Sequence, residues 1–281
     1  MSAGSGDTRR AALAARYGAD AIPSGEPGEG PWNAVIAALL DHRSVRAYRP
    51  DPLPEGTLET LVAAAQSAAT SSNMQTWSVV SVTDPGRKAR LARVAADQRH
   101  VEQCPLFLVW LADLSRLARL ADAEGHTLAG LPFLETFLVA TIDAALAAQN
   151  AAVAAESLGL ATVYIGALRN DVGAVAAELG LPPGCVGLFG LCVGYPDPAT
   201  PFRVKPRLPQ EAVLHRERYD AADAASRAAY DGALHAWGRG GNERTPYTWT
   251  ERVLARLGTT DALAGRDRLR EALEALGFPL R

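Results

Sequence analysis

Three short groups of polar, mostly cationic residues stand apart along this chain, and each could hold an anion. They are His42, Arg43, Ser44 and Arg46; Lys205 and Arg207; and Arg239 and Arg244. Arginine suits a phosphate because its planar guanidinium can donate two parallel hydrogen bonds. Lys205 and Arg207 lie in a proline-rich arm stiffened by Pro206, so they should point to the same side. The first two groups could bind one phosphate together and the third another, although each group alone also fits a solvated basic surface.

Further candidate residues surround a predicted strand end. Residues 161–165 are typical of a short strand that stops at Gly166, and Asn170 or Asp171 is a good N-cap for the helix that follows. Exposed N–H groups at such a place favour the polar edge of a ligand. The polar run 71–73 and Gln98 add hydrogen-bonding groups from other segments.

Several common chemistries have no motif in this sequence. No GxGxxG follows a predicted strand, and there is no GxxxxGK[ST], HExxH, GxSxG or paired-cysteine signature. The five histidines show no metal-ligand spacing, so no metal site is expected. An enzyme without an evident nucleophile or metal often takes its chemistry from an organic cofactor.

The composition describes an ordinary globular protein of 281 residues, with 48% apolar and 21% charged residues. A formal net charge of −3 gives no global attraction to nucleic acid or to an anionic membrane. Three cysteines without CxxC spacing indicate reduced core thiols of a cytoplasmic protein. The N-terminus has no apolar stretch typical of a secretory signal, so a cytoplasmic location is expected.

Apolar patterning predicts the elements that must position these residues. Strands are expected at residues 78–83, 106–112, 161–165 and 185–193, and the second of them should be buried on both faces. Helices are expected at residues 32–40, from about 54, at 87–96 and at 132–159.

The helix at 132–159 is the longest pattern and is apolar nearly all round. Its polar residues, among them Glu135, Asp143 and Glu156, argue against a transmembrane span. Its many alanines would let another helix approach closely. Either a dimer interface or a core helix within one chain would use such a surface.

The chain is predicted to divide into three parts. Residues 1–31 form a flexible leader with one short helix at 10–17, residues 32–212 form the core, and residues 213–281 form a helical extension. In the extension, Thr248 and Glu251 form a capping box that should open one helix, and a further helix is expected at 261–277.

Seven stretches follow one another in an order that is more specific than any one of them. They are residues 42–46, 71–75, 149–159, 163–166, 168–170, 188–192 and 205–209. Together they resemble the nitroreductase family, and more closely its NADPH-dependent branch of oxygen-insensitive type A nitroreductases and flavin reductases. The resemblance covers residues 32–281. It implies an α+β fold, a three-layer α/β/α sandwich with a mainly antiparallel sheet and a helical C-terminal extension. It also implies a homodimer with two FMN sites at the interface, which favours the dimer use of the long helix.

The resemblance also implies roles for individual residues. FMN would be bound by His42, Arg43, Ser44, Arg46, Thr70, Ser71, Gln98, Tyr164, Ile165, Gly166, Ala167, Lys205 and Arg207. Arg46 would reach the N1/O2 edge of the ring, where a cation stabilises the charge of reduced flavin. A backbone N–H near Gly166 would lie beside N5. Arg239 and Arg244 match the arginines for the NADPH phosphate, and Ser72, Asn73 and Met74 should face the substrate.

The implied activity is an FMN-dependent NADPH oxidoreductase that reduces nitroaromatics, quinones or both by ping-pong, two-electron hydride transfer. The chemistry would take place at FMN N5, so no side chain is expected to be catalytic, and the partner is a small-molecule electron acceptor. Two alternatives remain, an NADPH-flavin reductase that supplies reduced flavin to a partner and a non-catalytic flavin-binding protein. Ala167 in place of a common glycine, and Ala69-Thr70 in a serine-rich stretch, leave the substrate preference open.

Overall fold

The protein, analysed as a computed structural model, forms two compact units. Residues 3–18, 30–200, 202–221, 224–243 and 245–281 are described. The sheet unit comprises Ser44–Thr200 and Leu263–Arg281, and the helical unit comprises Met1–Arg43 and Pro201–Ala262. Both units join segments that are distant in the sequence, whereas the predicted three-part division follows chain order and stays a prediction. Residues 19–29 of the predicted leader lie outside the described residues.

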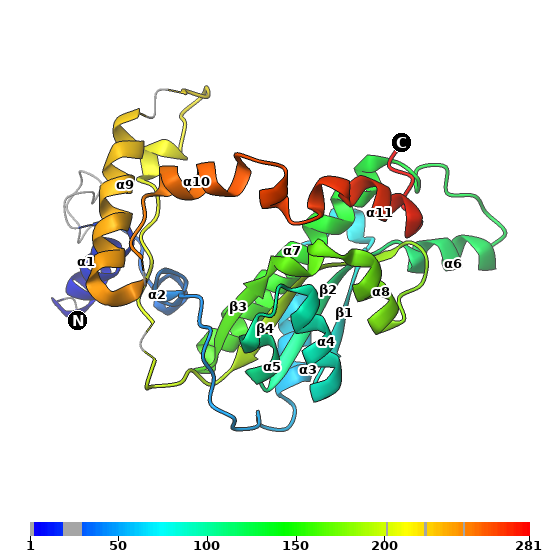
Figure 1. Cartoon of the computed structure of the whole chain (residues 1–281), viewed down its shortest axis with the longest axis horizontal. Coiled ribbons are helices and arrows are strands. Elements are labelled where there is room, and N and C mark those ends of the chain that lie inside the picture. The colour runs from blue at the N-terminus through cyan, green and yellow to red at the C-terminus, as the bar shows by residue number, and fades with distance from the viewer. Residues whose placement is uncertain (1–2, 19–29, 201, 222–223, 244) are drawn as a thin grey trace. The chain divides into compact units, whose positions relative to one another are not determined.

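The sheet unit is built on four strands in the order β1-β2-β4-β3 (Figure 1). They are β1 (Trp77–Val82), β2 (Leu106–Asp113), β3 (Ala161–Ile165) and β4 (Cys185–Gly194). Every neighbouring pair is antiparallel, and the register of β2 against β4 shifts between Trp110 and Leu111. These four strands confirm the apolar runs predicted from the sequence, to within a residue or two at their ends.

Strand β2 is buried along its whole length, as its continuous apolar run predicted. Leu106, Leu108 and Trp110 belong to one apolar cluster with the alanines of the long helix. The alternate residues face the other side, where Phe107 lies against Gly190 of β4. A Cβ atom on Gly190 would be 2.3 Å from Cζ of Phe107, so only glycine leaves room for the ring at this position.

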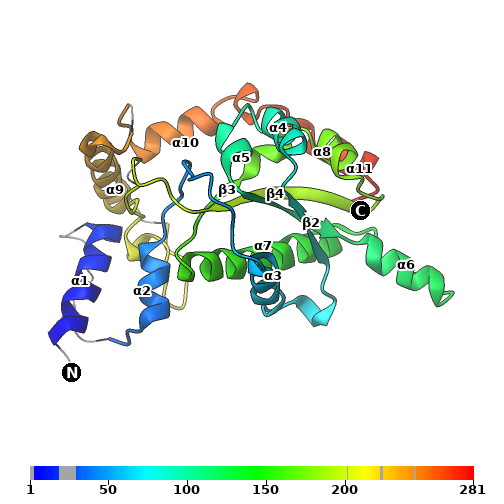
Figure 2. The ribbon, with the colours of Figure 1, turned by 90° about the horizontal axis from the view of Figure 1, so that it is seen from below.

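Helices cover both faces of this sheet and make three layers (Figure 2). One layer holds α3 (Thr57–Gln66) and α7 (Leu134–Ser157). The other holds α4 (Pro85–Val94), α5 (Arg99–Gln103), α8 (Val172–Leu179) and α11 (Leu269–Ala275), while α6 (Ser115–Ala123) extends beyond the end of the sheet. This arrangement confirms the predicted α+β sandwich with an antiparallel sheet.

Helix α7 carries small residues on its inner face. Ala147, Ala151 and Ala155 are fully buried against the sheet and α3. Large apolar side chains, by contrast, lie on its outer face. Leu134, Leu138, Ile142 and Leu146 follow one another every four residues and are between 40% and 56% exposed. By length and composition alone, α7 is the one helix among the described residues that could cross a membrane.

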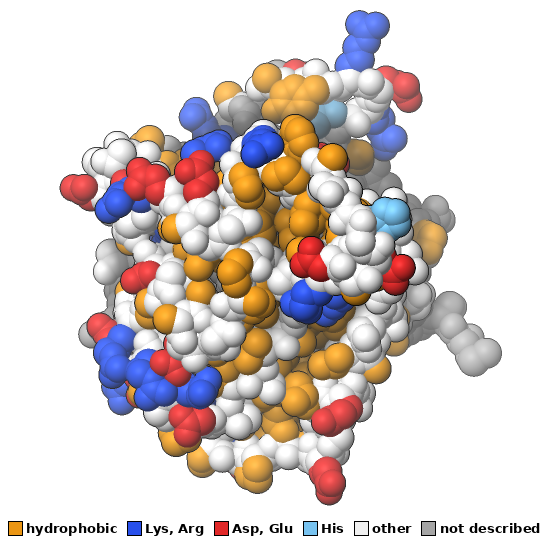
Figure 3. Space-filling model, turned by 90° about the vertical axis from the view of Figure 1, so that its right-hand side faces the viewer, with side chains coloured by type: hydrophobic (Ala, Val, Ile, Leu, Met, Phe, Trp, Pro, Cys, Tyr) orange, Lys and Arg blue, Asp and Glu red, His pale blue; other side chains and the backbone are white. Residues whose placement is uncertain are grey.

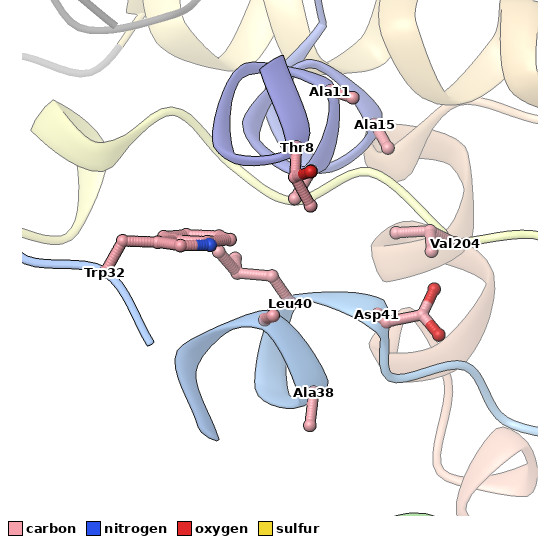
Figure 4. A pocket seen from close by; sticks show the side chains of 10 residues that line it. Thr8, Ala11, Ala15, Trp32, Ala38, Leu40, Asp41 and Val204 are labelled. Atoms are coloured by element: carbon pink, nitrogen blue, oxygen red, sulfur yellow. The ribbon is translucent and has the colours of Figure 1, made fainter. Parts of the chain in front are cut away.

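The helical unit contains α1 (Ala3–Tyr17), α2 (Ala34–Asp41), α9 (Ala224–Trp237), a π-helical turn (Gly238–Asn242) and α10 (Trp249–Leu257). The predicted capping box opens α10, since Glu251 N donates to Thr248 Oγ1 at 3.1 Å and Thr248 N donates to Glu251 Oε2 at 2.8 Å. A cavity of about 480 Å³ lies between α1, α2 and the arm that carries Val204 (Figure 4).

Two helix predictions need correction. The predicted single helix at 261–277 is wrong, because Ala264 and Gly265 have φ angles of 53° and 84° and break it into two short turns before α11. The short helix predicted at 10–17 begins earlier, at Ala3.

Candidate cofactor site

A buried arginine organises the cationic residues of the helical unit. Arg16, at the end of α1, is only 5% exposed. Its guanidinium donates to the carbonyls of Leu40 at 2.6 Å, His42 at 2.9 Å and Lys205 at 2.9 Å. Its own carbonyl accepts a hydrogen bond from Arg207 N at 2.8 Å. One side chain therefore joins two of the cationic groups that are separated by about 160 residues in the sequence.

Lys205 lies in an aromatic and acidic cage. Its Nζ donates to Glu243 Oε1 at 2.9 Å and to the Tyr247 hydroxyl at 3.0 Å, and it lies 4.6 Å from the centre of the Trp237 ring. An ammonium group has three donors, so two of them are used here. Glu243 therefore uses one of the donors that Lys205 could offer to an anion.

The other cations of this unit are more exposed. Arg43 pairs with Asp41 at 2.7 Å, and His42 is half-buried where α2 ends. Arg207 is exposed and donates to the carbonyls of Lys205 and Pro206 at 3.2 and 3.3 Å. Because cations are favourable near the C-terminus of a helix, the end of α2 suits His42 and Arg43.

In the sheet unit, the segment after Ser44 runs beside the edge strand β3. Ser44 forms a bridge with Thr162, and Val45 N donates to Thr162 O at 3.0 Å. The buried Tyr48 hydroxyl donates to Val45 O at 2.8 Å and keeps the turn closed. Arg46 is exposed between these anchored positions.

His100, at the start of α5 and two residues after Gln98, interacts electrostatically with Arg46. Burial, together with the smaller effect of the positive charge of Arg46, lowers the pKa of His100 to about 4. The ring is therefore neutral at pH 7. Its Nε2 is buried and has no hydrogen-bond partner among the described residues. A buried polar atom without a partner costs about 1–3 kcal/mol, which marks this position for a ligand or a water molecule.

The loop that contains Thr70 to Met74 has a strained backbone. Ser72, Asn73 and Gln75 have positive φ angles of 49°, 54° and 51°, which non-glycine residues rarely adopt. The buried carboxylate of Asp143 on α7 anchors the loop at both ends. It accepts hydrogen bonds from Ser71 N at 3.1 Å and from Thr76 N and Oγ1 at 3.4 and 3.0 Å.

The segment Tyr164–Ala167 ends β3 as predicted. The Tyr164 ring meets Phe189 edge-on at 5.5 Å, and its hydroxyl donates to Gln149 Oε1 at 3.4 Å. Burial raises the pKa of Tyr164, so the hydroxyl stays protonated. Ile165 is buried, and Gly166 opens a short turn, with Ala167 in it half-buried. Asp171 caps the helix that follows through Ala174 N at 2.8 Å.

The third cationic group is only partly described. Arg239 is exposed on the π-helical turn that follows α9. Arg244 lies outside the described residues. Within the part of the chain that is described, no group of three or more His, Cys, Asp and Glu side chains could hold a metal ion. Cys104, Cys185 and Cys192 are buried and unpaired.

Four residues that contact candidate site residues or lie close to them, two in each unit, were not singled out from the sequence. They are Arg16, His100, Asp143 and Glu243. Each acts through a partner far along the chain, such as Thr76 for Asp143 and Lys205 for Glu243. Only Asp143 carried a signal, as an acid in an otherwise apolar helix, and it was used there only against a membrane span.

Taken together, these features define an α+β sandwich protein with cationic and hydrogen-bonding groups suited to an anionic organic ligand. The model described as "Nitroreductase family" matches residues 39–195, and the model described as "Nitroreductase family, C-terminal domain" matches residues 205–281. The chain therefore belongs to the nitroreductase family.

Known relatives resemble most of the chain. It is 40% identical over 227 residues to the FMN reductase (NADPH) of Bacillus subtilis, covering 79% of this chain and 90% of the relative. It is 38% identical over 222 residues to the oxygen-insensitive NADPH nitroreductase of Salmonella typhimurium, covering 78% and 89%. The solved structure of NfrA1 from B. megaterium is similar with a TM-score of 0.82 at 40% identity, covering 88% of this chain and 100% of that one.

Proposed function

We propose that this chain is an FMN-dependent NADPH oxidoreductase. The observation that carries the proposal is the Arg16 cluster, in which one guanidinium holds the carbonyls of His42 and Lys205. This brings the backbones of two cationic segments together, and cationic side chains on neighbouring segments suit a dianionic phosphate. The names of the relatives, an FMN reductase (NADPH) and an NADPH nitroreductase, support the same cofactors.

We assign the remaining residues to the two ends of FMN. We assign the phosphate to His42, Arg43 and Ser44 with Lys205 and Arg207. We assign the ring and ribityl chain to Arg46, Thr70, Ser71, Gln98, Tyr164, Ile165, Gly166 and Ala167. The partnerless Nε2 of His100 beside Arg46 supports this assignment, because a polar ligand atom would give it the hydrogen bond that it lacks.

Bound FMN would supply the two-electron chemistry by taking a hydride from NADPH and passing it to an acceptor. Arg46 would hold the negative charge that develops at the edge of the ring. Because His100 is neutral at pH 7, Arg46 would supply the positive charge at this position. We expect Arg46→Ala to slow flavin reduction by about tenfold or more while FMN stays bound. Arg49→Ala is the control, because Arg49 is exposed and paired with Asp51 at 2.7 Å.

The visible spectrum of the purified protein tests the cofactor directly. Under anaerobic conditions we expect the absorbance of bound oxidised flavin, and its bleaching when NADPH is added. A colourless protein that does not bind added FMN would exclude the proposal.

We propose nitro compounds, quinones or free flavin as the acceptor, and the strained loop with Ser72, Asn73 and Met74 as the surface that selects it. Steady-state turnover with NADPH and each acceptor separates a nitro- and quinone reductase from a reductase that supplies reduced flavin. A chain that binds flavin but turns over none of them would be the non-catalytic alternative.

We assign the NADPH phosphate to Arg239 and Arg244. Replacing both by alanine should raise the KM for NADPH by about tenfold or more and leave the FMN content unchanged, because a charged hydrogen-bonded contact is lost. Arg270→Ala is a matched control in the sheet unit, where Arg270 is exposed. An unchanged KM would remove this assignment.

We also propose a homodimer built on α7. The inner face of α7 buries alanines, whereas its outer face exposes leucine and isoleucine side chains to water. Such exposed apolar side chains favour binding of a protein partner. Apolar side chains also form a band down the middle of the face that carries α6 and α11 (Figure 3). Leu138→Glu with Ile142→Glu should convert a dimer to a monomer in sedimentation velocity. A wild-type monomer would contradict the proposal.

We also propose a cytoplasmic location, which the three unpaired cysteines support.

A further inference from the structure

The N-terminal helix α1 lies outside both stretches that match the family, residues 39–195 and 205–281. It nevertheless contributes the most buried charged side chain of the described helical unit, Arg16. Its alanine face, with Ala11 and Ala15, lies across a cavity from α2 and Val204 (Figure 4). Three hydrogen bonds hold the Arg16 side chain at the end of α1.

The Arg16 guanidinium contacts the backbone of three positions. It donates to the carbonyls of Leu40, His42 and Lys205, so the end of α2 and the proline-rich arm are held on one planar group. The carbonyl of Arg16 accepts a hydrogen bond from Arg207 N at 2.8 Å, which holds the proline-rich arm at a second point. A lysine at this position could not make the same forked set of bonds, since its ammonium is a point donor.

We propose that Arg16 is a positioning residue for the phosphate of the flavin cofactor. It sets the backbone from which His42, Lys205 and Arg207 project, and so it lowers the cost of ordering these cations when the phosphate binds. This inference rests on the proposed function, because it requires that these residues bind the FMN phosphate.

Riboflavin, which has the same ring as FMN but no phosphate, separates positioning of the phosphate site from a general structural role. The full-length protein is freed of flavin, and the dissociation constants for FMN and riboflavin are measured by quenching of flavin fluorescence. The variants are Arg16→Lys, Arg16→Gln and Arg16→Ala. Arg10→Ala is the matched control, since Arg10 lies on the same helix and is exposed.

For Arg16→Gln and Arg16→Lys we expect FMN binding to weaken by about tenfold or more, because misplacement of a binding group lowers affinity steeply. Riboflavin binding should change by less than about threefold, so the preference for FMN shrinks. Arg10→Ala should keep the wild-type preference. Arg16→Ala is compared only if its circular dichroism spectrum matches the wild type, and the other two variants carry the test otherwise.

The outcomes are distinct. If the wild type prefers FMN and the folded Arg16 variants keep that preference, Arg16 is not a positioning residue. An equal weakening of both ligands also contradicts the inference, because it indicates a general structural role. If the wild type itself binds FMN no more tightly than riboflavin, the assigned phosphate site fails, and the proposed function must be revised first.

Discussion

The interactions that stabilise the inside of each unit differ between the two units of this chain. The sheet unit has a continuous apolar core, in which β2 and the inner face of α7 are wholly buried. In the described helical unit the buried apolar side chains are few, with Tyr230 and Leu234 among them. There, long-range polar contacts join the segments instead, from Arg16 to Lys205 and from Lys205 to Glu243.

The two kinds of interaction differ in how firmly they hold the backbone. A close-packed core fixes a backbone to within small distances and tolerates few substitutions. Hydrogen bonds with few buried apolar side chains hold a segment in place at a smaller free energy, so that such a segment can change conformation more easily. We therefore expect the same chemical change to cost more in the sheet unit than in the helical unit.

One hydrogen-bond motif occurs in both units and gives the largest contrast. Asp143 in the sheet unit accepts from Thr76 N and Oγ1, and Asp231 in the helical unit accepts from Thr250 N and Oγ1. Asp143 is buried and Asp231 is half-exposed. We expect Asp143→Ala to lower the free energy of unfolding by about 2–4 kcal/mol, and Asp231→Ala by about 0.5–1 kcal/mol.

Urea unfolding followed by circular dichroism measures both changes. Asp143→Asn is the control, because it keeps the shape and one acceptor oxygen and should cost less than Asp143→Ala. Equal costs for the two alanine variants would remove the contrast between the units.

Two glycines test the packing itself. Gly190→Ala places a methyl group where Phe107 lies, so we expect a loss of about 1–3 kcal/mol of unfolding free energy. Gly232 is exposed in α9 with open space around it. Gly232→Ala should therefore stabilise the chain by about 0.5–1 kcal/mol, since alanine favours a helix. Thermal unfolding shows whether Gly190→Ala lowers and Gly232→Ala raises the stability. Adding Phe107→Leu to Gly190→Ala should recover part of the lost stability.

The sheet unit should also show a pH dependence that comes from His100. Because the pKa of His100 falls to about 4 in the folded chain, the unfolded chain binds a proton first as the pH is lowered. Its contribution to stability is present above about pH 6.5 and is lost as the pH falls to about 4. After discounting for the half-exposed ring, we expect a loss of about 1 kcal/mol. Urea unfolding of the wild type and of His100→Asn at pH 7 and pH 4.5 measures this loss. If the free energy of unfolding changes equally with pH in both proteins, His100 does not contribute.

The smallest expected effect lies in the cage around Lys205. If Lys205 binds the FMN phosphate, Glu243→Gln removes a competing carboxylate and should tighten FMN binding by a few-fold, as expected for a half-exposed ion pair. Fluorescence titration with FMN measures the change, with Glu251→Gln, in the cap of α10, as the control. Weaker binding would show that Glu243 orients Lys205 for the phosphate.

The same contrast explains how much the sequence could predict. Apolar periodicity identified β2, β4 and α7, because burial of a strand or helix leaves a local pattern. It could not distinguish the buried Arg16 from the exposed Arg10 six residues earlier, since their environments depend on segments far along the chain. The break at Ala264 was also missed, because a positive φ at a non-glycine residue has no sequence signal. The cationic groups were found by residue type, but the contacts that order them were not.

Helix α7 links two of the candidate regions mechanically. Asp143 holds the strained loop and Gln149 holds the Tyr164 hydroxyl, six residues or about 9 Å apart along the helix axis. The alanines on the inner face of the helix have no side-chain rotamers, so they cannot absorb a displacement by changing conformation. We therefore expect a shift of the loop at Asp143 to be accompanied by a shift of Tyr164, because both contact the same helix.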